Sequence, residues 1–155
     1  MTNISGLKLI PIIVGDADGL IALVNVDDKN HNRAVSVVKN LYKQQATIIF
    51  PLTAVVEAVT ALQRKLSSPL LAEKVVKKIL ENELLIEPVD QEILLSAVSF
   101  FNPRGSKQNT LFDAIVAATA KKRYANKIFS FDHWYATIGL HITTEEEYEP
   151  KRTIA

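Results

Sequence analysis

The sequence contains no cysteine and only three histidines, which are scattered at positions 31, 133 and 141. Without thiols the chain has no disulfide scaffold, no thiolate catalysis and no cysteine-ligated zinc or iron centre. Three histidines this far apart also argue against a metal site built from imidazoles. Any metal that this chain binds is therefore expected to have oxygen ligands.

A large excess of positive or negative charge is missing as well, and so is a long apolar run. Eighteen lysines and arginines face seventeen acidic residues, so the net charge is +1 and nucleic-acid binding would need a local basic patch. The longest N-terminal apolar run, 9–14, contains Pro11 and is too short for a signal peptide or a membrane span. We expect a soluble cytoplasmic protein with no part in a membrane.

Short apolar segments alternate with helical patterns along the 155 residues, a length typical of one domain. Strands are expected at 9–14, 47–50, 84–86, 127–131 and 140–142. Helices are expected at 20–24, after Asp27 or Asp28, at 53–66, 70–80, 90–101, 111–123 and 133–137, with a turn at 15–19. This order predicts an α/β fold, a single three-layer domain with a central, mostly parallel sheet flanked by helices. The domain is expected to span 1–142, with a polar tail at 143–155.

Several acidic residues stand where a ligand site would form. Ligands of parallel sheets bind beyond the carboxyl ends of the strands, which places Asp16, Asp18 and Asp132 near one edge. Each also has a structural interpretation as a helix cap, and Asp113 fits a capping box with Thr110. From the sequence alone, both interpretations stay open for each aspartate.

Glu57 has no such structural explanation, because it lies four residues after Thr53, one too many for a capping box. Residues 54–62 around it are apolar on nearly every side, a pattern typical of a buried helix. Asp113 is likewise the only charged residue within 111–120. Ionised carboxylates are rarely buried without a partner, and neither stretch contains a lysine or an arginine.

Carboxylates that converge without a basic partner must share a cation or bind protons. The nearest cations on the two helices, Arg64 and Lys121, are expected to be solvated at helix ends. A divalent ion with hard oxygen ligands is the simplest solution, and Mg²⁺ or Mn²⁺ fits best. Calcium fits less well, because the sequence contains no twelve-residue acidic loop.

In their order along the chain, these residues resemble the acidic set of the PIN-domain ribonucleases, particularly the VapC-type toxins of toxin–antitoxin pairs. The resemblance covers about residues 10–142 and rests on the segments IIVGDADGLIAL (12–23), PLTAVVE (51–57), LFDAIVAATA (111–120) and IFSFD (128–132), with Trp134–Tyr135 after them. Two positions depart from the family pattern. Asp18 stands where members usually carry serine, threonine or asparagine, and Gly15 where an apolar residue is usual.

The resemblance implies a metal-dependent endoribonuclease that hydrolyses RNA with Mg²⁺ or Mn²⁺. The metal would lower the pKa of a bound water and offset charge on the attacked phosphate. The catalytic and metal-binding set implied for this chain is Asp16, Glu57, Asp113 and Asp132, with Asp18 as a further ligand. Ser130 would hydrogen-bond one of these ligands. The family also implies a small antitoxin that covers a groove near the site, and a homodimer.

RNA would be held outside the acidic pocket. Arg104 and Lys107 lie on the loop that enters the Asp113 helix and are the candidate phosphate contacts, with a solvated loop as the alternative. Trp134 and Tyr135 are candidates for stacking on bases, with ordinary packing as the alternative.

Two other functions are compatible with the sequence. The segment 16–19, Asp-Ala-Asp-Gly, resembles the nucleophile and acid pair of haloacid-dehalogenase-type phosphatases, in which Asp16 would attack phosphorus and Asp18 would protonate the leaving group. That mechanism leaves Glu57 and Asp113 unexplained. A catalytically silent PIN-like interaction module is the other alternative, against which the four retained acids argue.

Overall fold

The computed structural model describes residues 9–143, so all but the first residue of the predicted tail lies outside the described residues. The strands of this part are β1 (Ile12–Gly15), β2 (Thr47–Pro51), β3 (Leu85–Glu87), β4 (Lys127–Phe129) and β5 (His141–Ile142). The helices are α1 (Ala17–Val24), α2 (His31–Lys43), α3 (Leu52–Arg64), α4 (Pro69–Leu80), α5 (Gln91–Val98), α6 (Leu111–Lys122) and α7 (Trp134–Thr137). Within the same range, no helix combines the length and apolar character needed to cross a membrane.

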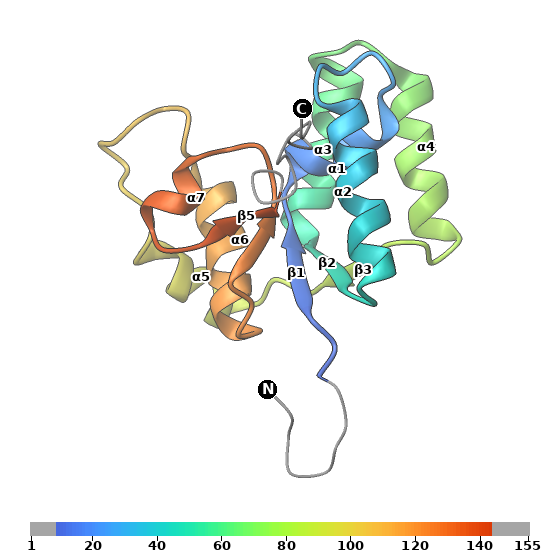
Figure 1. Ribbon diagram of the computed structural model, residues 1–155. Helices are drawn as coiled ribbons and strands as arrows, with labels where there is room; N and C mark the ends of the chain where they lie inside the picture. The colour runs from blue at the N-terminus through green and yellow to red at the C-terminus, as the bar shows by residue number, and fades with distance from the viewer. Residues whose placement is uncertain (1–8, 144–155) are drawn as a thin grey trace, which may run out of the picture.

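The strands form one sheet in the order β3-β2-β1-β4-β5, and every neighbouring pair is parallel. Figure 1 shows α1, α2, α3 and α4 on one side of this sheet and α5, α6 and α7 on the other. The predicted three-layer α/β domain is therefore confirmed. Because all strands run the same way, their carboxyl ends meet at one edge of the sheet.

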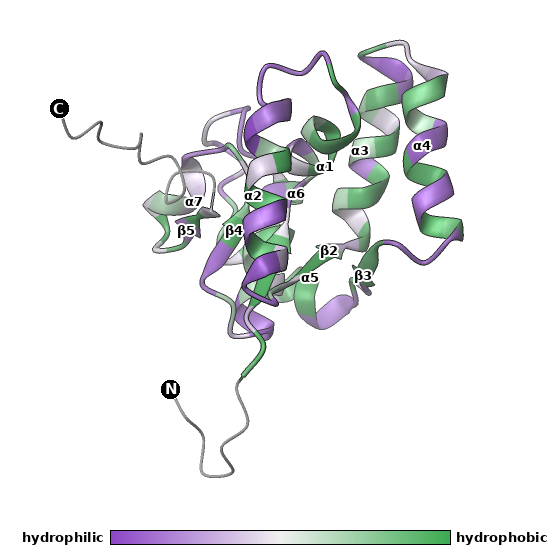
Figure 2. Cartoon of the chain, turned by 45° about the vertical axis from the view of Figure 1, so that its right-hand side comes forward, coloured by the Kyte–Doolittle hydropathy of each residue, from purple (hydrophilic) through white to green (hydrophobic). Residues whose placement is uncertain are grey.

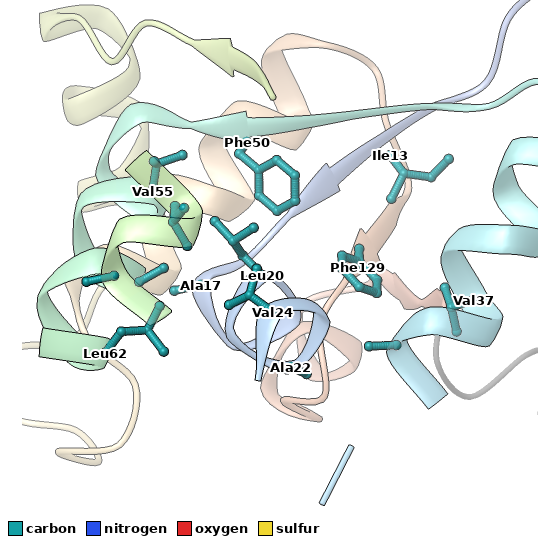
Figure 3. Packing of buried hydrophobic residues seen from close by; sticks show 14 of the residues in the cluster. Ile13, Ala17, Leu20, Ala22, Val24, Val37, Phe50, Val55, Leu62 and Phe129 are labelled. Atoms are coloured by element: carbon teal, nitrogen blue, oxygen red, sulfur yellow. The ribbon is translucent and has the colours of Figure 1, made fainter. Parts of the chain in front are cut away.

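Alternate residues of the central strands supply two separate cores. One core contains Ile13, Phe50 and Phe129 together with residues of α1 to α4, and Figure 3 shows these three side chains gathered with Leu20 of α1. The second core includes residues of α6 and α7. It also contains Val14, Ile49 and Ile128, each of which is next in sequence to one of the three strand residues of the first core. Successive strand residues point to opposite faces, so apolar strands without alternation are those covered on both sides.

The prediction of a turn at 15–19 is wrong. β1 continues through Gly15, and α1 follows after a single residue, its N-cap Asp16. Both glycines are required by close packing, because an ideal Cβ on Gly15 would lie 2.2 Å from the ring of Phe50. On Gly19 it would lie 2.8 Å from the carbonyl oxygen of Phe129. The residues that require these glycines lie on strands distant in sequence, so the local sequence contains no sign of them and its two glycines indicate a turn instead.

The two helices expected to be buried on all sides differ from each other. α6 is buried continuously from Asp113 to Ala120, as predicted. In α3, however, Leu52 is 47% exposed and Val56 54% exposed, so the prediction is wrong for this helix. The described elements leave uncovered a face of α3 whose residues recur one turn apart.

The predicted helix starts have mixed outcomes. Asp90 caps α5 as expected, by accepting a hydrogen bond from the backbone. Thr53 lies inside the first turn of α3 instead of at its N-cap, and its buried hydroxyl has no partner among the described residues. Neither Asp27 nor Asp28 caps α2, whose N-cap is Asn30.

The inward face of α4 is narrower than its sequence pattern indicates. The apolar residues of the helix recur at helical spacing and predict an inward face that includes Leu70, Val75, Val76 and Leu80, but only Val75 of these four is buried. Figure 2 shows hydrophobic and hydrophilic residues alternating along this helix. α4 packs at the margin of the fold against α3 and α1, so only one narrow stripe of its apolar residues finds a partner.

Candidate active site

Five predicted site residues lie at the carboxyl edge of the sheet, on segments far apart in the sequence. Asp16 follows β1 directly, with Asp18 one residue into α1, and Asp132 lies just beyond β4. Glu57 belongs to α3, which follows β2 without a loop, and Asp113 lies in the first turn of α6. In Figure 1, β1 points toward the end of the molecule where α1 and α3 lie.

Asp16 is the most buried of the five, with 4% of its surface exposed. Its carboxylate accepts hydrogen bonds from the backbone N–H of Ala17 at 2.7 Å and from the hydroxyl of Tyr135 at 2.7 Å. Tyr135 is fully buried, so packing and not base stacking is the right interpretation of this residue. Its neighbour Trp134 contacts it edge-on, with ring centres 5.2 Å apart. No sequence spacing indicates that Tyr135 donates a hydrogen bond to the site, because its partner lies 119 positions away.

Ser130 connects three of the acidic residues. Its hydroxyl lies 3.0 Å from Oδ2 of Asp18 and 3.4 Å from Oδ2 of Asp16, and its single hydrogen can be donated to one of them at a time. Its oxygen also accepts the backbone N–H of Asp132 at 3.0 Å. The backbone N–H of Phe131 donates to Oδ2 of Asp18 at 2.8 Å. This chain therefore holds Asp18, its departure from the family pattern, inside the site.

Like Asp16, which caps α1, Asp113 and Asp132 carry out the structural roles that their positions indicate. Asp113 accepts the backbone N–H of Thr110 at 2.7 Å, as expected for a capping box. Asp132 accepts the backbone N–H of Trp134 at 2.9 Å and the side-chain amide of Asn109 at 3.1 Å. A carboxylate has two oxygens and about four acceptor positions, so these bonds leave capacity for a further ligand.

Glu57 lacks such partners. The residue is half-buried, yet its Oε2 is enclosed and has no hydrogen-bond partner among the described residues. A buried charged oxygen without a partner is costly, typically by about 1–3 kcal/mol or more. Such an atom points to a ligand or a proton that completes its surroundings.

Burial raises the pKa of four carboxyl groups in the site: Asp16, Asp18, Glu57 and Asp113. The pKa rises from 3.8 to about 6 for Asp18 and from 4.5 to about 7 for Glu57. After burial, the charge of Asp113 raises the pKa of Glu57 further, and the charge of Lys65 opposes this rise. Within residues 9–143, no ion pair joins any of the five acids to a lysine, arginine or histidine.

The chemistry of this donor set suits a hard divalent cation, because carboxylate oxygens are the preferred ligands of Mg²⁺ and Mn²⁺. In the part of the chain that the structure describes, however, no three such side chains are already arranged to hold a metal ion. Carboxylates repel one another, and here each aspartate is held by hydrogen bonds to neutral groups instead of by a shared cation. Binding of one cation by three of these side chains would therefore require side-chain rotation. Rotation of Glu57 would break no hydrogen bond of its Oε2, which has no partner among the described residues.

Two basic pairs flank the acids. Arg104 and Lys107 are exposed on the loop between α5 and α6, which is tied to the site by the bond from Asn109 to Asp132. The other pair, Arg64 and Lys65, is exposed at the end of α3, as expected for Arg64. Both members line a pocket of about 530 Å³ whose wall also includes Val56, Glu57, Thr60, Ala61, Thr110 and Phe112. No local sequence pattern reveals this pocket, because it forms only where α3 and α6 meet.

The family model of the PIN domain matches residues 13–139. Among solved structures, VapC20 from Mycobacterium tuberculosis, described as a sarcin–ricin loop cleaving toxin, is 19% identical with a TM-score of 0.69, covering 83% of this chain and 95% of that chain. FitAcB from Neisseria gonorrhoeae is 15% identical with a TM-score of 0.58, covering 84% and 95%. A search of curated proteins finds no significant match. At these identities the two structures show a shared fold.

Proposed function

This chain belongs to the PIN domain family, and on that premise we propose that it is an endoribonuclease that hydrolyses RNA phosphodiester bonds with Mg²⁺ or Mn²⁺. The observation that carries the proposal is a set of buried carboxyl groups with raised pKa values and no basic partner in residues 9–143. The haloacid-dehalogenase alternative finds no support in this family match and still leaves Glu57 and Asp113 without a role.

In this proposal Asp16, Glu57 and Asp113 hold the cation, Asp132 binds it directly or through water, and Asp18 is a further ligand. The bound metal supplies an acidified water and neutralises charge on the attacked phosphate. The protein's own side chains keep the carboxylates ionised and oriented toward the position of the cation. Burial and the charge of Asp113 raise the pKa of Glu57 to about 7, so a proton competes with the cation for this carboxylate near neutral pH.

Tyr135 and Ser130 hold two of these carboxylates, Asp16 and Asp18, in place. The hydroxyl of Tyr135 donates to Asp16, and hydrogen bonds to an ionised carboxylate lower its pKa against the effect of burial. Ser130 does the same for Asp18. Arg104 and Lys107 would hold RNA phosphates from the loop beside Asp132.

We further propose that the chain is the toxin of a toxin–antitoxin pair, that a small antitoxin protein binds it, and that it forms a homodimer. Support comes from its fold, which it shares with VapC20, a structure described as that of a toxin. Expression together with the product of the adjacent gene should give a stable complex of two different chains. Light scattering of the chain alone should give twice its monomer mass.

The test of the enzyme proposal is cleavage of RNA in EDTA, in Mg²⁺ and in Mn²⁺. Wild-type protein should cleave only with metal, and Asp113→Asn should lose cleavage while keeping its fold, because asparagine still accepts the N–H of Thr110. The matched control is Asp27→Asn, an exposed aspartate beyond the end of α1, which should cleave normally. Cleavage in EDTA or by Asp113→Asn would refute the proposal. A wild-type protein that never cleaves RNA would favour a catalytically silent interaction module.

A further inference from the structure

The pocket beside Glu57 opens between the exposed face of α3 and the first turn of α6. We propose that it is a subsite for one nucleotide of single-stranded RNA next to the scissile phosphate, in which the base stacks on Phe112 and Arg64 and Lys65 bind phosphates. This assignment rests on the proposed nuclease function, since the subsite would bind the RNA that the acidic site cleaves. It is separate from the loop that carries Arg104 and Lys107.

The walls of the pocket match a nucleotide in character. Phe112 is 42% exposed and Val56 is 54% exposed, so a large aromatic and a large aliphatic side chain face solvent beside the buried Asp113. The polar residues Thr60 and Thr110 belong to the same lining. The volume, about 530 Å³, lies in the range of small-molecule sites, which are mostly apolar with a few polar groups. Aromatic side chains stack on bases of any sequence.

The charge distribution favours RNA over other occupants. The acidic site repels a phosphate chain, so binding needs cations close to the acids but outside them. Glu57, Ala61 and Lys65 recur at helical spacing along one side of α3, about 12 Å from first to last. The charge of Lys65 reaches the carboxylate of Glu57, after the larger effects of burial and of Asp113. The pocket therefore leads from the acidic site to a pair of cations.

The experiment measures binding of a short single-stranded RNA containing 2-aminopurine, in EDTA so that the RNA stays intact. Phe112→Leu should abolish the stacking-dependent quenching and weaken binding by roughly 5- to 150-fold, whereas Phe112→Trp should restore both. Arg64→Ala and Lys65→Ala should each reduce the slope of log affinity against log salt by about 0.7. All three side chains are exposed, so these variants should stay folded, as thermal unfolding would show.

Exposed residues on other helices provide matched controls. Leu95→Ala on α5 and Lys77→Ala on α4 should leave quenching, affinity and salt slope unchanged. With metal present, the subsite variants should raise KM for RNA cleavage more than they lower kcat, because they alter substrate grip and not the ligands of the cation.

The outcomes separate this inference from the proposed function. RNA that binds and stacks on Phe112 in a protein that never cleaves it would support the subsite while removing the nuclease. Unchanged affinity, quenching and salt slope in all the subsite variants would overturn the proposal and assign the groove to a protein segment. A wild-type protein that binds no single-stranded RNA would overturn it as well.

Discussion

Replacing Glu57 by glutamine removes one charge from the acidic site while keeping the shape of the side chain. Burial and the charge of Asp113 raise the pKa of Glu57 from its ordinary 4.5 to about 7. The folded protein therefore holds this proton more tightly than the unfolded chain does, and stability falls as pH rises from about 4.5 through about 7. Glutamine carries no charge at any of these pH values, so Glu57→Gln should escape this loss.

The size of the effect follows from the pKa. A rise from 4.5 to about 7 corresponds to about 3 kcal/mol in the free energy of unfolding above pH 7. Glu57 is only half-buried, and solvent screening reduces this figure to about 1–2 kcal/mol. For a chain of this length, such a gain raises the melting temperature by roughly 3–6 °C.

The assay is thermal unfolding in EDTA at about pH 8 and about pH 5. Glu57→Gln should melt above wild type at the higher pH and much closer to it at the lower pH, while Glu73→Gln, exposed on α4, should match wild type at both. Saturating Mg²⁺ or Mn²⁺ should stabilise wild type more than the variant, because a ligand bound only by the folded state raises its stability. A variant no more stable than wild type at about pH 8 in EDTA would refute the reasoning.

Two individual contacts and the raised pKa of Asp18 can be tested in the same way. Tyr135→Phe should lower the free energy of unfolding by about 1–3 kcal/mol in urea denaturation at about pH 8, since Asp16 loses a buried donor, and an unchanged midpoint would argue against this bond. Gly19→Ala should cost about 1–3 kcal/mol, because the added Cβ would approach Phe129, and a neutral result would show that the helix shifts freely. Wild-type stability in EDTA should fall as pH rises through about 6, the raised pKa of Asp18, and excess Mg²⁺ should abolish this fall.

The sheet and its layers could be predicted because their signals are local and repeated. Apolar strands without alternation predict two covered faces, and helices between successive strands require parallel pairing. The continuous apolar stretch around Asp113 predicted a buried helix correctly. Similar apolar surroundings of Glu57 gave a wrong prediction of a helix buried on all sides. Burial of α3 depends on which neighbouring elements pack against it, and one of its faces has none among the described residues.

The parts of the site that escaped prediction depend on contacts between distant segments. The bond from Tyr135 to Asp16 joins residues 119 positions apart, and no local spacing reveals it. Gly15 and Gly19 were interpreted as turn residues although rings from other strands require them. The pocket that includes Phe112 depends on the approach of α6 to α3. The carboxylates themselves could be found, because a charge within an apolar stretch is a local anomaly.

The central claim is that these carboxylates share a divalent cation, and direct titration with Mn²⁺ followed by electron paramagnetic resonance tests it without any RNA. Wild-type protein at about pH 8 should bind Mn²⁺ saturably and release it to Mg²⁺. Asp16→Asn and Asp113→Asn should each weaken this binding strongly, while Asp27→Asn should bind as wild type does. Absence of saturable binding, or equal binding by all four proteins, would contradict the claim.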